Sequence, residues 1–240
     1  MLIPGFVIRG SGNKRLILRG IAPSLSAFGI GDTLQDPTLQ LFSGNTELGA
    51  NDNWADNPNA AEIVSAGLAP TNTREPALLV TLAPGSYTAV MRGKDGSTGV
   101  GLVEVYDLDA DGPAKVVNIS TRGFVLPGDN GMFGGFIITG NDPSQWVIRA
   151  IGPSLGAFGV PSPLADPFLE IHDGNGATIQ TNNNWRDSQE AALQNTGLAP
   201  TDNLEAAVLI SLAPGSYTAI VKGADGGIGN GLVEIYKLSP

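Results

Sequence analysis

The chain contains no cysteine and a single histidine, His172. Without cysteine there can be no disulfide, thiolate zinc site, iron–sulfur cluster or cysteine nucleophile. One imidazole cannot build a multi-histidine metal site or supply two separate base catalysts. Any function must therefore rest on other side chains or on the surface of the fold.

Charge is also scarce, and positive charge most of all. Charged residues make up 15% of the chain, with 13 Lys and Arg against 23 Asp and Glu, so the net charge is −10. A nucleic-acid backbone or an anionic membrane surface would repel such a chain. The apolar runs are only as long as strands, and the first residues, MLIP, have no signal-peptide pattern. We expect no nucleic-acid partner and no membrane insertion.

Glycine and proline are abundant instead, at 33 and 17 residues, while 42% of the residues are hydrophobic. This balance predicts a folded chain with many turns rather than a disordered one. The chain also repeats itself. RGIAPSLSAFGIG at 19–31 returns as RAIGPSLGAFG at 149–159, and LAPGSYTA at 82–89 returns at 212–219. We therefore predict two domains, 1–109 and 110–240, with an extra strand over 115–125 that precedes the second copy.

Short runs rich in Val, Ile, Leu and Tyr, each closed by Gly, Pro, Asn or Asp, predict strands throughout both copies. The segment APGSY at 83–87 suits a type II turn in a hairpin. One short helix is expected in each copy, Pro58–Ala66 with a cap at Asp56 or Asn57, and Gln189–Thr196. The predicted fold is all-β: two tandem antiparallel β-sandwiches, jelly-roll-like or immunoglobulin-like, each with about seven or eight strands.

The quoted motifs, together with DPTLQLFSGN at 36–45 and GLVEVYDL at 101–108, resemble a tandem repeat module of large secreted bacterial proteins. They are also similar to bacterial pre-peptidase C-terminal (PPC-like) sandwiches. The resemblance covers nearly the whole chain. It implies an extracellular or cell-surface module without catalytic activity, and it implies no particular ligand.

Nucleophilic catalysis has little support in the sequence. Ser24 and Ser154 recur in the two copies, but a serine hydrolase needs a base and an orienting acid beside the nucleophile. His172 has Phe42 at its place in the first copy, so the repeat contains no shared catalytic set. We expect no catalytic residues and no enzymatic activity.

Charged residues inside apolar strands predict structural ion pairs. Arg19 and Arg149 end the runs LILR and WVIR, and Glu104 and Glu234 sit within LVEV and LVEI. A charge in a half-buried strand usually needs a partner. The pairs Arg19–Glu104 and Arg149–Glu234 are therefore predicted, in preference to a carboxylate pair for catalysis.

Two ligand sites stay open as alternatives. Calcium prefers hard oxygen ligands in loops, such as those of Asp and Asn side chains. Asp and Asn also form ordinary turns, however, and no EF-hand spacing is present. The candidates are Asp36, Asn51, Asp52, Asp166 and Asn182. A tryptophan on a loop of a sandwich could instead stack on a sugar ring, or else close one end of the sandwich. The candidates for this site are Trp54, Trp185, Asn53 and Asn184.

A segment with strand character precedes the second copy, and nothing equivalent stands before the first. Its residues are Val116, Val117, Asn118, Ile119, Ser120, Thr121, Arg122, Gly123 and Phe124. One donor strand for two sandwiches leaves one sheet edge unpaired, and proteins normally cover such edges. A neighbouring domain could supply the missing strand, a second chain could pair edge to edge, or the edge could stay open.

These observations predict a non-enzymatic extracellular structural or adhesive protein that assembles end to end by β-strand pairing into a fibre or surface array. The alternative is a carbohydrate-binding accessory module of a secreted enzyme or surface protein. The expected partners are further copies, neighbouring domains of a longer chain, or a glycan. No cofactor is expected, with calcium as the open alternative.

Overall fold

The computed structural model describes residues 1–128 and 130–238, and nearly all regular structure in them is β. The predicted all-β sandwich class is confirmed. The chain divides into two compact units, Met1–Val117 (unit 1) and Asn118–Pro240 (unit 2). This division falls later than the boundary predicted between 109 and 110. No helix among the described residues is long and apolar enough to cross a bilayer.

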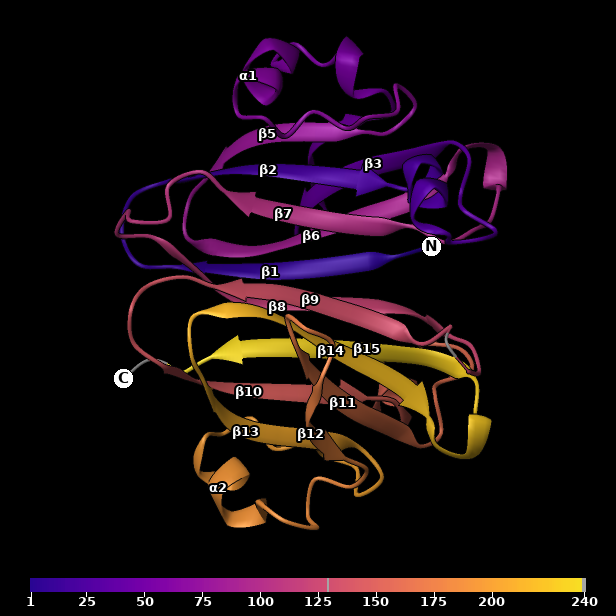
Figure 1. Cartoon of the computed structure of the whole chain (residues 1–240), viewed down its shortest axis with the longest axis vertical. Coiled ribbons are helices and arrows are strands. Elements are labelled where there is room, and N and C mark those ends of the chain that lie inside the picture. Colours follow the sequence, from indigo (N-terminus) through magenta and orange to yellow (C-terminus); the bar gives the residue numbers. More distant parts are fainter. Residues whose placement is uncertain (129, 239–240) are drawn as a thin grey trace. The chain divides into compact units, whose positions relative to one another are not determined.

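Unit 1 contains seven strands in two antiparallel sheets (Figure 1). One sheet has the order β4-β3-β6-β1, and the other has the order β5-β2-β7. The strands are β1 (Ile3–Arg9), β2 (Lys14–Ile21), β3 (Pro37–Ser43), β4 (Thr46–Asn51), β5 (Ala77–Leu82), β6 (Gly85–Gly93) and β7 (Leu102–Asp107).

Unit 2 repeats this plan with one strand more. One sheet has the order β12-β11-β14-β9, and the other has the order β13-β10-β15-β8. The strands are β8 (Lys115–Val125), β9 (Met132–Ile138), β10 (Ser144–Ile151), β11 (Pro167–Asp173), β12 (Thr178–Asn182), β13 (Ala206–Leu212), β14 (Gly215–Gly223) and β15 (Gly229–Lys237).

The side-chain alternation of the strands explains the sandwich. In β3 the residues Pro37, Leu39 and Leu41 are buried and the residues between them are more exposed, as period-two alternation requires. β2 differs because both of its faces are buried: Leu16 and Ile17 are both 0% exposed. Ile17 packs with Ile63 and Ala77 under the helical segment that follows β4. The sheet that contains β2 is therefore covered on both sides.

The predicted hairpin at 83–87 is wrong in one respect. The Pro-Gly segment does join β5 to β6, but β5 pairs with β2 whereas β6 pairs with β1 and β3. The turn therefore carries the chain from one sheet to the other. The hairpins are instead β3–β4 and β11–β12, whose strands do pair with each other.

Each unit contains one short α-helix, as predicted, and 3-10 turns that the sequence did not indicate. α1 (Ala60–Ser65) begins after Asn59 and α2 (Glu190–Asn195) after Gln189, so both start later than predicted. Asn57 does not cap α1 directly; its side-chain oxygen accepts from the Asn59 N–H at 2.8 Å. The 3-10 helices are η1 (Pro23–Phe28), η2 (Trp54–Asp56), η3 (Lys94–Gly96), η4 (Pro153–Phe158) and η5 (Ala224–Gly226).

Candidate functional site

The first predicted ion pair, Arg19–Glu104, is present in unit 1. β2 and β7 place the two residues directly opposite each other. The Arg19 Nε donates to Glu104 Oε2 at 2.8 Å, and its Nη1 donates to the Leu68 carbonyl at 2.9 Å. The guanidinium also lies over the Tyr106 ring, 4.9 Å from its centroid. With every polar group engaged inside the fold, the pair has a structural role.

Unit 2 repeats this arrangement with Arg149 and Glu234. The Arg149 Nε donates to Glu234 at 2.9 Å, and Nη1 donates to the Leu198 carbonyl at 2.7 Å. Burial, followed by the charge of Glu234, raises the pKa of the Tyr236 phenol to about 12. The cause is that an ionised phenol would be desolvated beside a carboxylate.

A second feature shared by the two units is a buried glutamate, whose structural role the sequence does not predict. Glu75 is 0% exposed, and its Oε1 accepts from the Ala22 N–H at 3.0 Å and from the Ser24 N–H at 2.9 Å. Glu205, also 0% exposed, binds the Gly152 and Ser154 N–H groups in the same way. These carboxylates hold the PSL segments of η1 and η4, which explains why the serines recur without forming an active site.

The candidate calcium ligands are largely used within the loops. The Asn51 side-chain oxygen accepts from the Ala77 N–H at 2.9 Å, and its amide donates to the Asn53 carbonyl at 3.0 Å. Asn182 makes the equivalent bonds in unit 2. One oxygen each of Asp36 and Asp166 is buried without a partner. Within residues 1–128 and 130–238, no group of three His, Cys, Asp or Glu side chains is placed to hold a metal.

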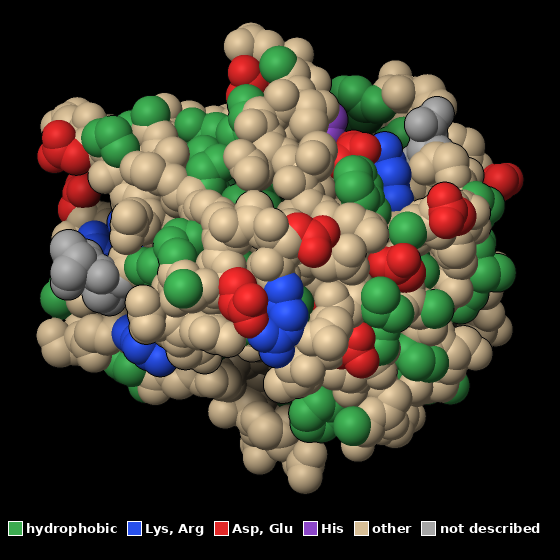
Figure 2. All heavy atoms as spheres, turned by 90° about the horizontal axis from the view of Figure 1, so that it is seen from below, with side chains coloured by type: hydrophobic (Ala, Val, Ile, Leu, Met, Phe, Trp, Pro, Cys, Tyr) green, Lys and Arg blue, Asp and Glu red, His purple; other side chains and the backbone are tan. Residues whose placement is uncertain are grey.

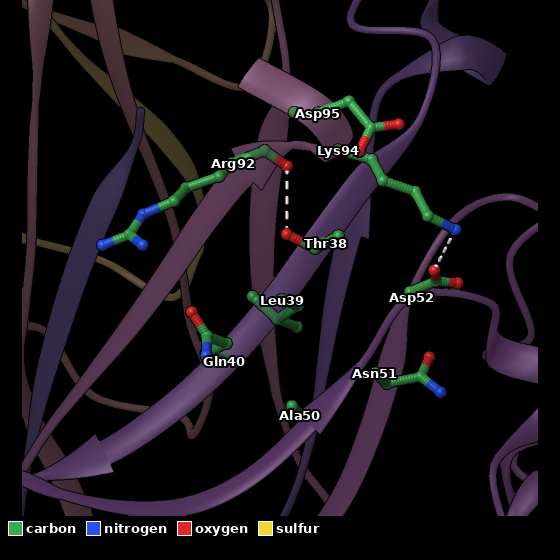
Figure 3. Close-up of a pocket in the computed structure, with 10 residues that line it drawn as sticks. Thr38, Leu39, Gln40, Ala50, Asn51, Asp52, Arg92, Lys94 and Asp95 are labelled. Carbon is green, nitrogen blue, oxygen red and sulfur yellow. Dashed lines mark hydrogen bonds and ion pairs between the residues drawn. The ribbon is translucent and has the colours of Figure 1, made fainter. Parts of the chain in front are cut away.

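Asp52 has a protein partner of its own. Its carboxylate accepts from the Lys94 ammonium group at 2.5 Å across a shallow groove on the β4-β3-β6 face (Figure 3). Figure 3 shows Thr38 donating to the Arg92 carbonyl on the floor of the groove, while the Arg92 side chain points away from Lys94. The groove has no nucleophile with a base and an orienting acid beside it, so it lacks the elements of a hydrolytic site.

The two candidate tryptophans lie inside their units rather than on open platforms. Trp185 is 2% exposed, and its indole N–H donates to the Asp202 carbonyl at 2.9 Å. Trp54 is half-buried and packs with Ile17 and Ile63. Asn53 and Asn184 donate to Asp56 and Asp187, three residues further on. This geometry matches the role of closing one end of the sandwich. It leaves neither face of the Trp185 indole ring accessible for stacking on a sugar.

No concentrated charge appears on the visible surface. On the face in Figure 2, acidic and basic side chains are scattered among hydrophobic and uncharged ones.

His172 lies on β11 beside Glu170, with 3.1 Å between His172 Nε2 and Glu170 Oε2, and Lys222 contacts the same carboxylate at 3.0 Å. Burial alone would raise the pKa of Glu170, but its bonds to Lys222 and His172 together lower it. His172 is therefore part of a polar cluster with Glu170 and Lys222.

The predicted donor segment is the strand β8, and it completes a sheet of unit 2. It pairs with β15 in antiparallel register, with Ile119 opposite Ile235 and Arg122 opposite Leu232. Val125 is 0% exposed and belongs to the core of unit 2, and Ile119 packs against the same core. β15 therefore has a strand on each side, β10 and β8.

The equivalent strand of unit 1, β7, has a partner on one side. Among residues 1–128 and 130–238, β7 pairs with β2, and its sheet ends there. The consequence appears in the exposure of its side chains. Val103 and Val105 are half-buried, whereas their counterparts Val233 and Ile235 are 1% exposed. Leu102 is 40% exposed. The open edge of β7 is the feature that most distinguishes unit 1 from unit 2.

Comparison with known proteins identifies no family. No protein-family model matches the chain, and no curated protein matches it. Solved structures show only low similarity. They include the STIV MCP (11% identity over 99% of this chain and 91% of that chain, TM-score 0.30) and a structure of Sulfolobus Turreted Icosahedral Virus (10% identity, 97% and 85%, TM-score 0.30). A third is the M60 catalytic domain with two CBM51 domains of Clostridium perfringens ZmpB (5% identity, 96% and 33%, TM-score 0.24).

Proposed function

We propose that this chain is a non-enzymatic extracellular structural or adhesive protein whose two β-sandwiches join neighbouring modules by β-strand pairing. The observation that carries the proposal is the contrast between β15, which β8 covers, and β7, whose outer edge has no strand among the described residues. An open edge presents unpaired N–H and C=O groups, which favour pairing with another chain.

The chemistry of the repeated residues supports the same proposal. The features that both units share are an Arg–Glu pair between neighbouring strands and a buried glutamate that fixes a loop. Each engages groups of its own unit and serves to rigidify the sandwich. Duplicated, rigid sandwiches are suited to building an extended array, because each unit can carry its own core.

The test is the assembly state of the purified chain, alone and with a second module that begins with an unpaired strand of the sequence 114–127, followed by light scattering and electron microscopy. Because β8 of each copy is engaged with β15, longer particles are expected when that module is added, and they should be lost when Val105 is replaced by lysine. The matched control is Leu48→Lys on β4, also in unit 1 and already exposed. Particles that do not grow when the module is added would count against joining by strand pairing.

The carbohydrate-binding alternative predicts a different result. Glycan-array binding that is lost in Trp54→Ala, with the fold retained, would replace the structural proposal. Tryptophan fluorescence quenching provides the accompanying check, because an indole that stacks on a sugar must be accessible to a small quencher.

A further inference from the structure

We infer that the outer edge of β7 is an acceptor site for an extended strand of the β8 type, supplied by a separate polypeptide segment. The inference rests on the proposed function and names its partner. The site comprises Gly101 to Tyr106. Its occupant is defined by what covers the equivalent edge in unit 2, where β8 pairs with β15 from Gly229 to Tyr236.

The register of the proposed complex follows from the repeat. Val105 corresponds to Ile235, which lies opposite Ile119, and Leu102 corresponds to Leu232, which lies opposite Arg122. A β8-type strand on β7 would therefore place an apolar side chain over the half-buried Val105. It would also cover Leu102, which is 40% exposed. Burying this apolar surface would add to the backbone hydrogen bonds of the new ladder.

In unit 1 a methionine fills the place that a core residue of the extra strand occupies in unit 2. In unit 2, Val125 lies against Gly231, with its Cγ2 3.1 Å from the position that a Cβ there would occupy. In unit 1 the side chain that lies against the equivalent glycine, Gly101, is Met91. Methionine is flexible and fills irregular gaps. Met91 thus covers the place that Val125 takes in unit 2, and it can move when a strand arrives.

The repeat, rather than charge, defines the occupant as a β8-type strand. β7 contains two acidic residues, Glu104 and Asp107, and both are already paired inside unit 1, with Arg19 and Lys14. The edge of β7 therefore carries no uncompensated charge that a partner must neutralise. The strand that covers the equivalent edge in unit 2 is β8, and the β8 strand of another copy is itself engaged with β15. The occupant is therefore a separate strand of the β8 type.

The probe for the test is a synthetic peptide with the sequence of residues 114–127, AKVVNISTRGFVLP, added to the full chain. Hydrogen–deuterium exchange of Leu102–Asp107 should slow by at least about tenfold, as expected when edge amides join a ladder. The control peptide carries Ile119→Ser and Val125→Ser, which keep its charge and remove its core contacts. Unchanged exchange at β7, or peptide that displaces β8 from β15, would overturn the inference.

A cross-linking experiment tests the register, and the absence of natural cysteine makes it clean. Leu102→Cys in the protein should form a disulfide with a peptide that carries Arg122→Cys, and much more slowly with one that carries Ser120→Cys. Equal rates would contradict the register. Rapid disulfide dimers of the Leu102→Cys protein alone would identify a second copy as the occupant. That result would overturn this inference while leaving the proposed assembly by strand pairing intact.

Discussion

The ammonium group of Lys94 lies 2.5 Å from the carboxylate of Asp52, and the equivalent positions in unit 2 hold Ala224 and Asn183 instead. The hydrogen bond and charge of Asp52, with further contributions from the charges of Asp36 and Asp95, raise the pKa of Lys94. In unit 1, Asp52, Asp36 and Asp95 therefore all favour the charged form of Lys94. Whether a unit has this cation decides how its neighbouring aspartates affect stability.

Unit 2 has no cation at the position equivalent to Lys94. Asp166 and Asp225 repeat the aspartates of unit 1, but Ala224 stands where unit 1 has Lys94. Burial, and then the charge of Asp225, raises the pKa of Asp166. The folded protein therefore binds a proton on Asp166 more tightly than the unfolded chain does. Its ionised form opposes folding at neutral pH, and the penalty disappears as the pH falls through the folded-state pKa.

Asp166→Asn should consequently raise the free energy of unfolding at neutral pH, by about 0.5 kcal/mol. The gain should vanish in acid, where the wild-type carboxyl is protonated. Urea unfolding at several pH values measures it. Asp36→Asn is the matched control, because it removes a charge that favours the charged form of Lys94 and should lower stability. Equal effects of the two substitutions would contradict the explanation.

Glu205→Ala should destabilise unit 2 by about 3 kcal/mol, because it leaves buried N–H groups of Gly152 and Ser154 without an acceptor. Glu205→Gln keeps one acceptor oxygen and should lose less than half of that amount. Chemical denaturation provides the measurement. Glu190→Ala is the control, since Glu190 forms an exposed pair with Arg186 and should cost at most about 0.5 kcal/mol. A loss of the same size in the control would rule out the loop-fixing role of Glu205.

The phenol of Tyr236 predicts a specific alkaline transition. Its pKa in the folded protein is about 12, above the ordinary value of 10.0. The contribution of this group to stability is therefore fully present below the unfolded-state pKa, and it is lost as the pH rises from there through about 12. Unfolding followed by circular dichroism between these values should show a steeper loss in the wild type than in Tyr236→Phe. Identical profiles would exclude this phenol as the cause.

The sequence predicted those features that depend on local pattern. Short apolar runs identified the strands, and the rule that a charge in an apolar strand needs a partner identified Arg19 with Glu104. The strand character of Val116–Phe124 identified the donor strand. In each case the information lies within a few residues, or in the comparison of the two copies.

Other features depend on contacts between distant segments, which local pattern does not encode. The residues at 83–87 predict a turn, but nothing in them shows that β5 and β6 belong to different sheets. Local pattern does not predict the role of Glu75, because its partners, Ala22 and Ser24, lie far away in sequence. The one sequence signal that links them is the recurrence of Glu75 as Glu205 alongside the recurring PSL segment.

The different surroundings of Met91 and Val221 lead to the last prediction. The two residues are equivalent in the repeat, yet Met91 covers Gly101, whereas in unit 2 Val125 from β8 covers Gly231. Met91→Val should therefore leave a gap and destabilise unit 1 by about 1–2 kcal/mol. Val221→Met should overpack unit 2, because Val125 already fills the space, at a cost of about 1–3 kcal/mol. Denaturant unfolding measures both effects.

The same substitution should also change strand binding. Met91→Val vacates the space that Val125 of the β8-type peptide would enter, so the variant should bind this peptide more tightly than the wild type and recover part of its lost stability when the peptide is present. The control peptide with Val125→Ser should give no such recovery. If Met91→Val were as stable as the wild type and bound the peptide no better, Met91 would not be standing in for a missing strand. The exposed apolar residues of β7 would then need another explanation.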